Sequence, residues 1–390
     1  MQYPAFPSHI AVLTAGLLLA ACGGGNYDGG SVTPTAEGVL KDANVAGLNY
    51  SSGGQKGATG ADGSFTYEVG RDVTFFLGGL IIGTVPGQAV VTPIDFAQNG
   101  STSSAEVLNR VRLLMLLDED ANPDNGIQIS VALRDHADVT PSIWQPVDFT
   151  VTTDDDLNAE LNLIMVDLII NLQRQPRSLE TEITAAVAQD HLESTLRCVR
   201  SGGFRGTLTS GDTGRLGVMV DAATGEVRGY ITRSGSGTLI ELDGDDPVSL
   251  DQEAFFTSTG TGATFMGRLL DPDTIVGTWQ HVVSGTYQGT RLGGAGNAVY
   301  RFTATYEGAV DAGVYTFDIN AAGNITGTAY SVPDDRLTTL SGTLSNSANL
   351  FVTTSEGRSV TAVLDLTAGT MTGGFDGDGN TLTGSGCRLN

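Results

Sequence analysis

One acidic segment of the chain carries oxygen-bearing side chains at alternate positions and could bind a metal ion. These side chains belong to Asp118, Asp120, Asn122 and Asp124. The spacing is that of the first half of an EF-hand loop, in which carboxylate and amide oxygens bind Ca²⁺. The second half differs, because Gly126 is displaced from the glycine position and Ile129 stands where a bidentate glutamate is expected. The segment is thus either a calcium site or a polar loop whose side chains cap backbone amides.

The chain has three cysteines, and the first lies at the end of an apolar segment. Residues 11–21 are too few to span a bilayer of roughly 30 Å as a helix rising about 1.5 Å per residue, and they are typical of a signal peptide. The segment ends Leu19-Ala20-Ala21-Cys22, which resembles the lipobox of bacterial lipoproteins. The resemblance implies that a signal peptide of residues 1–21 is removed and that the Cys22 thiol receives a diacylglyceryl group. The alternative is an ordinary cleaved signal peptide followed by a chance cysteine.

Glycine-rich residues follow Cys22. We expect residues 22–36 to form a flexible tether that lets the folded part stand off the membrane. Gly23 occupies the position at which an aspartate is associated with inner-membrane retention, so the resemblance implies the outer membrane. We therefore expect a protein anchored to that membrane through its lipid and exposed at the cell surface. The alternative orientation faces the periplasm.

The other two cysteines are expected to form a disulfide. Once Cys22 is lipidated, Cys198 and Cys387 remain as a pair in a compartment that permits disulfides. Such a bridge would tie together the two ends of the C-terminal half of the chain. The alternative is a pair of buried thiols.

Several patterns that would indicate an enzyme are missing from the sequence. After signal removal the histidines are His136, His191 and His281, and they form neither an HExxH motif nor a Cys/His metal-binding pattern. The sequence has no Gly-x-Ser-x-Gly elbow and no P-loop, so neither a serine hydrolase nor nucleotide binding is expected. A carboxylate pair for glycoside cleavage is defined in space rather than in sequence and stays open. We expect a non-enzyme, with calcium as its one candidate cofactor.

The charge of the chain excludes one class of partner. The 390 residues include 44 acids and 20 bases, which gives a formal charge of −24. This charge repels nucleic-acid phosphates, so nucleic-acid binding is not expected. The two lysines are Lys41 and Lys56, and such scarcity suits either salty surroundings or a GC-rich genome.

The elements that would position these residues are mainly β-strands, beginning with a small module at residues 37–97. Short alternating apolar runs are separated there by glycine turns, which predicts a β-sandwich. Residues 59–65, with an Asp-Gly bend before Phe65, resemble the turn of carboxypeptidase regulatory-like and related Ig-like domains. The resemblance implies a non-catalytic spacer in which the aromatic ring fills the sandwich.

Residues 98–200 are expected to form a helical connector that carries the acidic loop. Ser103 and Glu106 have the spacing of a capping box ahead of a first helix. Apolar residues at helical spacing predict a second helix from about Asp156 and a third from about Ser178 to Leu196. We expect these helices to pack as core rather than to bind a partner.

From residue 201 onward the chain is a duplicated all-β region, with units at 201–293 and 294–390. Apolar and polar residues alternate along the strands, and matching segments recur at offsets of 95 to 98 residues. The matches are 218–221 with 315–318, 225–229 with 323–327, 275–279 with 371–375, and 286–289 with 381–384. Each unit has room for about eight short strands, which can close as a meander barrel or fold as a sandwich.

The expected function is binding or adhesion at the cell envelope, with a glycan or a protein surface as ligand. Residues 78–83, 91–95 and 113–127 resemble a region that recurs in bacterial surface lipoproteins of unknown biochemical function. Trp144 and Trp279 could supply a surface for stacking sugars, although Trp279 stands at an alternating apolar position and is expected in the core. The alternatives are a periplasm-facing structural or assembly accessory and a carbohydrate-active enzyme.

Overall fold

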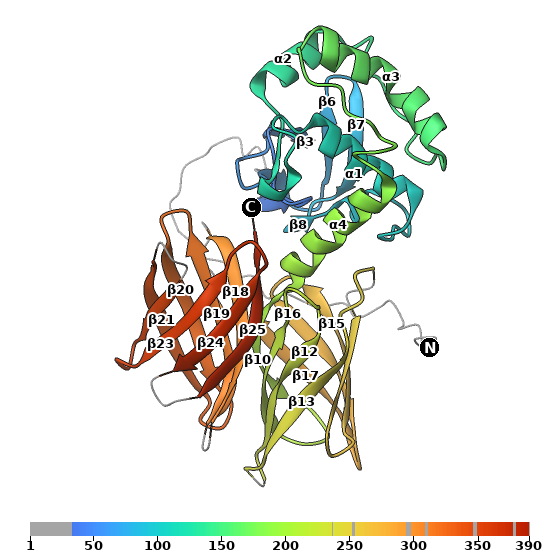
Figure 1. Ribbon diagram of the computed structural model, residues 1–390. Coiled ribbons are helices and arrows are strands. Elements are labelled where there is room, and N and C mark those ends of the chain that lie inside the picture. Colours follow the sequence, from blue (N-terminus) through green and yellow to red (C-terminus); the bar gives the residue numbers. More distant parts are fainter. Residues whose placement is uncertain are drawn as a thin grey trace, which may run out of the picture. The chain divides into compact units, whose positions relative to one another are not determined.

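The structure is a computed structural model that describes residues 33–235, 237–251, 254–293, 298–308, 311–345, 349–376 and 380–389. It is mainly β, with three small N-terminal sheets, a group of α-helices and two closed eight-stranded barrels (Figure 1). The expected fold class is therefore confirmed. Cys22, the signal peptide and most of the tether lie outside the described residues.

The N-terminal strands form two main sheets with the orders β5-β1-β8 and β4-β3-β6-β7, and a third, two-stranded sheet of β2 and β9. Their bounds are β1 Thr35–Leu40, β2 Val45–Ala46, β3 Asn49–Ser52, β4 Gln55–Ala58, β5 Ser64–Glu68, β6 Asp72–Leu77, β7 Leu80–Pro86, β8 Val90–Val91 and β9 Ile127–Gln128. Phe65 is buried, and its ring centroid lies 5.1 Å from that of Phe75 and 5.8 Å from that of Tyr50. The prediction that this aromatic ring fills the module is confirmed.

Four α-helices and two short 3-10 helices follow β8, and β9 lies between η2 and α2. Their bounds are η1 Pro93–Phe96, α1 Ala105–Leu117, η2 Pro123–Asn125, α2 Val131–Val139, α3 Asp154–Ile170 and α4 Ala185–Arg200. The first helix begins one residue later than a capping box at Ser103 requires, because Ser104 is its N-cap residue. Glu106 instead pairs with Arg110 one turn along the helix, at 2.9 Å.

Sequence reasoning missed α2 and placed α4 too early. Helix α2 has nine residues and buries only Leu133 and Ala137, so its apolar periodicity is weak. Its start is nonetheless marked by Ser130, whose hydroxyl accepts a hydrogen bond from the amide of Leu133. Residues from Ser178 to Ile183 form turns rather than helix, and Thr184 is the N-cap residue of α4.

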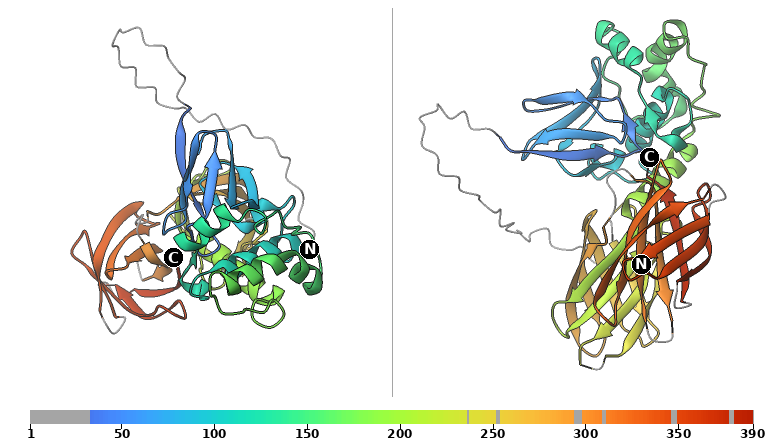
Figure 2. Two further views of the ribbon diagram at one scale, coloured as in Figure 1. Left: turned by 90° about the horizontal axis from the view of Figure 1, so that it is seen from above. Right: turned by 90° about the vertical axis from the view of Figure 1, so that its left-hand side faces the viewer.

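The N-terminal sheets and the helices share one hydrophobic core. Side chains of β6, α1 and α4 belong to the same buried cluster, which includes Phe75, Leu114 and Leu192. In Figure 2 the blue strands lie against the green helices in both views. The division at residue 97 into a sandwich and a connector therefore stays a prediction, because no separate core marks it.

The duplicated region folds as two up-and-down barrels. The first comprises β10 Gly202–Leu208, β11 Gly214–Val220, β12 Val227–Arg233, β13 Leu239–Asp246, β14 Ala254–Thr259, β15 Thr264–Asp271, β16 Thr274–Gln280 and β17 Ser284–Arg291. The second comprises β18 Ala298–Glu307, β19 Ala312–Asn320, β20 Asn324–Ser331, β21 Arg336–Leu344, β22 Asn349–Thr354, β23 Ser359–Asp365, β24 Thr370–Asp376 and β25 Thr381–Arg388. In each barrel the first strand pairs with both the second and the last, and the repeated sequence segments fall on equivalent strands.

The barrels lie side by side and pack through their first strands (Figure 1). A separate apolar cluster joins them, with Met219 and Tyr230 from the first barrel and Val314, Tyr330 and Val332 from the second. Gly217 allows this approach, because an added Cβ would lie 2.5 Å from Cγ2 of Val332. The amide of Gly203 also donates a 2.7 Å hydrogen bond to Oγ1 of Thr316 in the other barrel.

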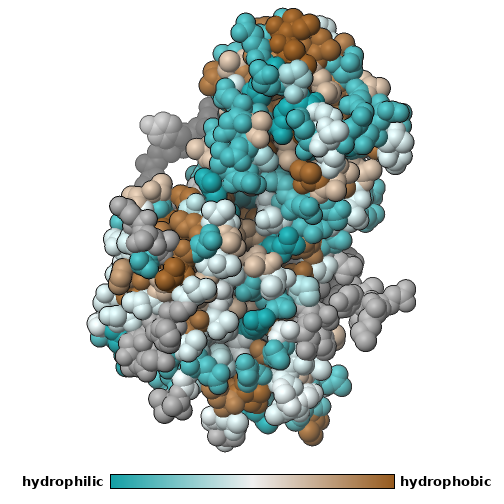
Figure 3. Space-filling view, viewed as in Figure 1, coloured by the Kyte–Doolittle hydropathy of each residue, from teal (hydrophilic) through white to brown (hydrophobic). Residues whose placement is uncertain are grey.

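Apolar side chains gather on one exposed part of the molecule. Figure 3 shows them where Figure 1 places α2 and α3, and they include Val139, Leu163 and Ile170, which are 77%, 59% and 67% exposed. Within the described residues, no helix is both long enough and apolar enough to cross a bilayer.

Candidate functional site

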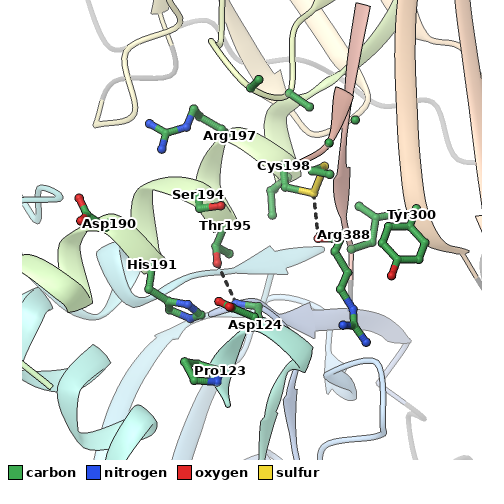
Figure 4. A pocket seen from close by; sticks show the side chains of 18 of the residues that line it. Pro123, Asp124, Asp190, His191, Ser194, Thr195, Arg197, Cys198, Tyr300 and Arg388 are labelled. Carbon is green, nitrogen blue, oxygen red and sulfur yellow. Dashed lines mark hydrogen bonds between the residues drawn. A yellow bond between two sulfur atoms is a disulfide. The ribbon is translucent and has the colours of Figure 1, made fainter. Parts of the chain in front are cut away.

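A cleft of about 640 Å³ lies between α4, the loop around η2 and the final strand of the second barrel (Figure 4). Its ionisable lining side chains are Lys41, Asp124, Asp190, His191, Arg197, Tyr300 and Arg388. Cations and the histidine outnumber the two aspartates, although the whole chain carries 44 acids and 20 bases. The lining of the cleft therefore carries more basic than acidic side chains, although the protein as a whole is acidic.

A tight turn at residues 41–44 closes one end of this cleft. Ala43 adopts a φ of +53°, which places the turn in the left-handed region. The amide of Ala43 donates a 2.9 Å hydrogen bond to Oγ1 of Thr195 on α4. Nζ of Lys41 donates to Oδ1 of Asn44 and, at 3.1 Å, to the carbonyl oxygen of Leu389. The turn thus joins the N-terminal module to both α4 and the C-terminal strand.

The charge of Lys41 is sensitive to its surroundings. Burial lowers the pKa of Lys41 to about 8, with Asp62 opposing this shift and Arg301 adding to it. The ammonium group consequently begins to lose its proton slightly above neutral pH. The sequence singled out Lys41 only because lysine is rare in this chain. It did not assign Lys41 to a site, because Leu389 and Arg301 lie far away along the chain.

His191 forms a buried ion pair with Asp42 behind the wall of the cleft. Its Nε2 atom lies 3.4 Å from Oδ1 of Asp42, and both side chains are more than nine-tenths buried. Burial lowers the pKa of His191, but the carboxylates of Asp42 and Asp124 outweigh burial and leave that pKa above its usual value. The sequence did not reveal the acidic partner of His191, because Asp42 lies far away along the chain.

The predicted disulfide is confirmed. Cys198 near the end of α4 is bonded to Cys387 in β25, with 5.7 Å between their Cα atoms (Figure 4). The bond lies in the wall of the cleft. On the same strand, the guanidinium of Arg388 lies 5.9 Å from the ring centroid of Tyr300.

The acidic loop has the hydrogen bonds of a capped polar loop. Oδ1 of Asp118 accepts from the amide of Gln128 at 2.8 Å, and Oδ1 of Asp120 accepts from the amide of Asn122 at 3.0 Å. Asp124 instead lines the cleft. Among the described residues, no three Asp, Glu, His or Cys side chains lie together in a way that could hold a metal ion. Calcium at Asp118, Asp120, Asn122 and Asp124 stays a prediction.

The remaining candidates from the sequence are structural. Trp144 and Trp279 are both buried, which confirms the expectation for Trp279. Asp167 accepts hydrogen bonds from Nε2 of His136 at 2.9 Å and from Nε1 of Trp144 at 3.0 Å. Burial opposes ionisation of Asp167, but these bonds and one from Asn171 keep its pKa below the usual value. His136 therefore serves to hold α2 against α3.

Comparisons with family models, with curated proteins and with solved structures gave no match to this chain.

Proposed function

We propose that the protein is exported and anchored by a lipid on Cys22 to the outer membrane, where it binds a glycan or protein ligand without catalysis. The observation that carries the export step is the Cys198–Cys387 disulfide. Structural disulfides persist in oxidising compartments and are rare in the cytosol. The bond therefore supports the interpretation of residues 1–21 as a signal peptide.

The cleft beside the disulfide supports the binding step. Its volume of about 640 Å³ falls within the range of roughly 300–1,000 Å³ that is typical of ligand sites. Tyr300 and Arg388 offer an aromatic face and a guanidinium, which suit a sugar ring or an acidic group. We propose that the ligand contacts this pair.

Fractionation of cells that express the tagged full chain tests the anchor. Wild-type protein should sediment with outer membranes, whereas Cys22→Ser should move to the soluble fraction. Ser31→Ala is the matched control, since it changes a nearby residue of the tether, leaves Cys22 in place and should stay with the membrane. Membrane association of Cys22→Ser would refute the lipid anchor.

Protease shaving of intact cells, with lysed cells as control, tests the orientation. Cleavage of the barrels on intact cells is expected for a surface-exposed binding protein. Cleavage after lysis alone would refute adhesion and favour the periplasm-facing accessory. Ligand arrays should then compare wild-type protein with Tyr300→Ala, using Phe351→Ala as an exposed control in the same barrel.

A second candidate function is glycoside hydrolysis, and one groove between the barrels favours it. Glu241, Asp243 and Glu307 line a groove of about 510 Å³ together with Tyr230. Burial raises the pKa of Glu241, and the carboxylates of Glu307 and Asp243 raise it further. A carboxyl of raised pKa beside a second carboxylate is the kind of pair that cleaves glycosidic bonds.

Hydrolysis of a panel of polysaccharides by the purified protein tests this candidate. Activity that falls by about a hundredfold or more in Glu241→Gln, in line with the loss of a general acid, would establish it. The control is Glu356→Gln, which changes a carboxylate elsewhere in the second barrel. Equal rates in wild-type protein and Glu241→Gln would refute an enzymatic role for the groove.

A further inference from the structure

A second cleft, of about 880 Å³, adjoins the first and shares Lys41 and Leu389 with it. Its walls come from three parts of the chain. The N-terminal module contributes Asp62, the rim of the first barrel contributes Asp273 and Arg291, and the rim of the second contributes Arg301. Three basic side chains from three separate elements therefore open into one cavity.

The two arginines are held in place by the protein itself. Nε of Arg301 donates to Oδ1 of Asp318 at 2.9 Å, and Nη2 donates to Oδ2 at 3.2 Å. Arg291 donates to the carbonyl oxygens of Pro272, Val199 and Ser201. A guanidinium has five N–H donors, so these bonds use two on Arg301 and three on Arg291. Both groups are fixed in direction, and each has N–H donors that bond to none of the residues that the structure describes.

The basic side chains of this cleft lower one another's pKa. Burial and the charge of Arg301 together lower the pKa of Arg291 to about 9, while Asp273, Asp318 and Asp271 oppose the shift. Arg301 also lowers the pKa of Lys41. Arg301 is paired with the buried Asp318. The acids that line the cleft itself act more weakly on Lys41 and Arg291, because the Asp273 side chain is 81% exposed and Asp62 accepts a hydrogen bond from the amide of Ser64. An anion placed among the three cations would relieve their mutual repulsion.

We propose that this cleft binds an oxyanion through Lys41, Arg291 and Arg301. Preoriented guanidinium groups match the paired oxygens of carboxylate, sulfate and phosphate. The cavity is much larger than an inorganic ion, so its ligand is an oxyanion carried on a larger molecule such as an acidic saccharide. The proposal stands apart from the proposed function, since it uses neither the lipid anchor nor the Tyr300 contact.

Calorimetric titration of the full chain with sulfate, phosphate and glucuronate, at constant ionic strength set with chloride, tests the proposal. Loss of one charge-assisted contact should weaken binding about tenfold in Lys41→Gln. Lys56→Gln is the matched control, because Lys56 lies on exposed β4 and is the other lysine of the chain. Binding of glucuronate but not of the inorganic ions would identify a sugar-borne ligand. No binding, or equal loss in both variants, would overturn the proposal.

Proton linkage supplies a test that needs no variant. Lys41 faces Asp62 and Arg301, and an anion bound beside it must raise its pKa from about 8. Anion binding near pH 8 should therefore take up protons, and affinity should fall between pH 7 and pH 9. Titration in buffers with different ionisation enthalpies measures the uptake. A proton exchange of zero at pH 8 would contradict a role for Lys41.

Discussion

The two barrels share one topology, yet they attach to the end of α4 by different chemistry. The last strand of the second barrel is bonded to α4 through the Cys198–Cys387 disulfide. The last strand of the first barrel reaches the same turn of helix through Arg291, which donates to the carbonyl oxygens of Val199 and Ser201. A covalent bond thus attaches the second barrel to α4, and hydrogen bonds from a buried guanidinium attach the first.

The difference shows that duplication preserved the strands and left the attachment free to change. Phe204 and Phe302 lie on the first strands of the two barrels, and both are fully buried. In contrast, Tyr287 of the first barrel corresponds to Leu382 of the second, and both side chains are buried. Inward apolar volume is what the barrel requires, and the identity of each residue is secondary.

The largest effect is expected from breaking the covalent attachment. Cys198→Ser should lower the free energy of unfolding by up to about 5 kcal/mol, because a bond between residues 189 apart removes much entropy from the unfolded chain. Urea unfolding of the oxidised wild-type protein and the variant measures the change. Cys387→Ser should give the same loss, and a difference between the two variants would show that the effect does not come from the bond.

Breaking the non-covalent attachment should lower the free energy of unfolding by a smaller amount. Arg291→Gln leaves several buried carbonyl oxygens without a donor, for an expected loss of about 3 kcal/mol. The control is Arg268→Gln in β15, where the side chain is exposed and the expected change is below about 0.5 kcal/mol. A loss in Arg291→Gln as small as in the control would mean that Arg291 does not hold the barrel.

The sequence predicted two repeated all-β units because their information is local and repeated, but it left open whether each unit closes as a barrel or folds as a sandwich. Alternation along each strand and the offset between matching segments were sufficient for the fold class. Cys198 and Cys387 could also be paired, because removal of Cys22 leaves one combination. Arg291, Lys41 and Asp42 could not be assigned, since their partners lie far along the chain or are backbone carbonyls. Helix α2 was missed because nine residues with two buried side chains carry too little periodicity.

The contact between the barrels can be tested at Gly217. Gly217→Val would place side-chain atoms against Val332 and Tyr330, and such overpacking should cost about 2 kcal/mol. Gly235→Val is the control, because nothing lies within 4 Å of a Cβ at that position. Chemical denaturation followed by tryptophan fluorescence reports on the first barrel through Trp279 and on the N-terminal core through Trp144. Equal stability of the two variants would argue against tight packing between the barrels.

Helix α4 also carries a third attachment, and this one depends on pH. His191 pairs with Asp42, so the helix contacts the N-terminal module as well as both barrels. The pKa of His191 is raised in the folded state, and the folded protein therefore holds this proton more tightly than the unfolded chain does. The stabilisation is complete below the unfolded pKa of about 6.5 and is lost as pH rises through the folded pKa.

The smallest predicted effect is the change with pH in the stabilisation that the His191–Asp42 pair provides. His191→Gln should lower the free energy of unfolding more at pH 5.5 than at pH 8.5, because the imidazolium is the form that pairs with Asp42. His281→Gln is the control, since His281 is exposed. If His191→Gln lowers the free energy of unfolding equally at both pH values, the pair acts through packing rather than charge. The prediction that this attachment of α4 depends on pH is then wrong.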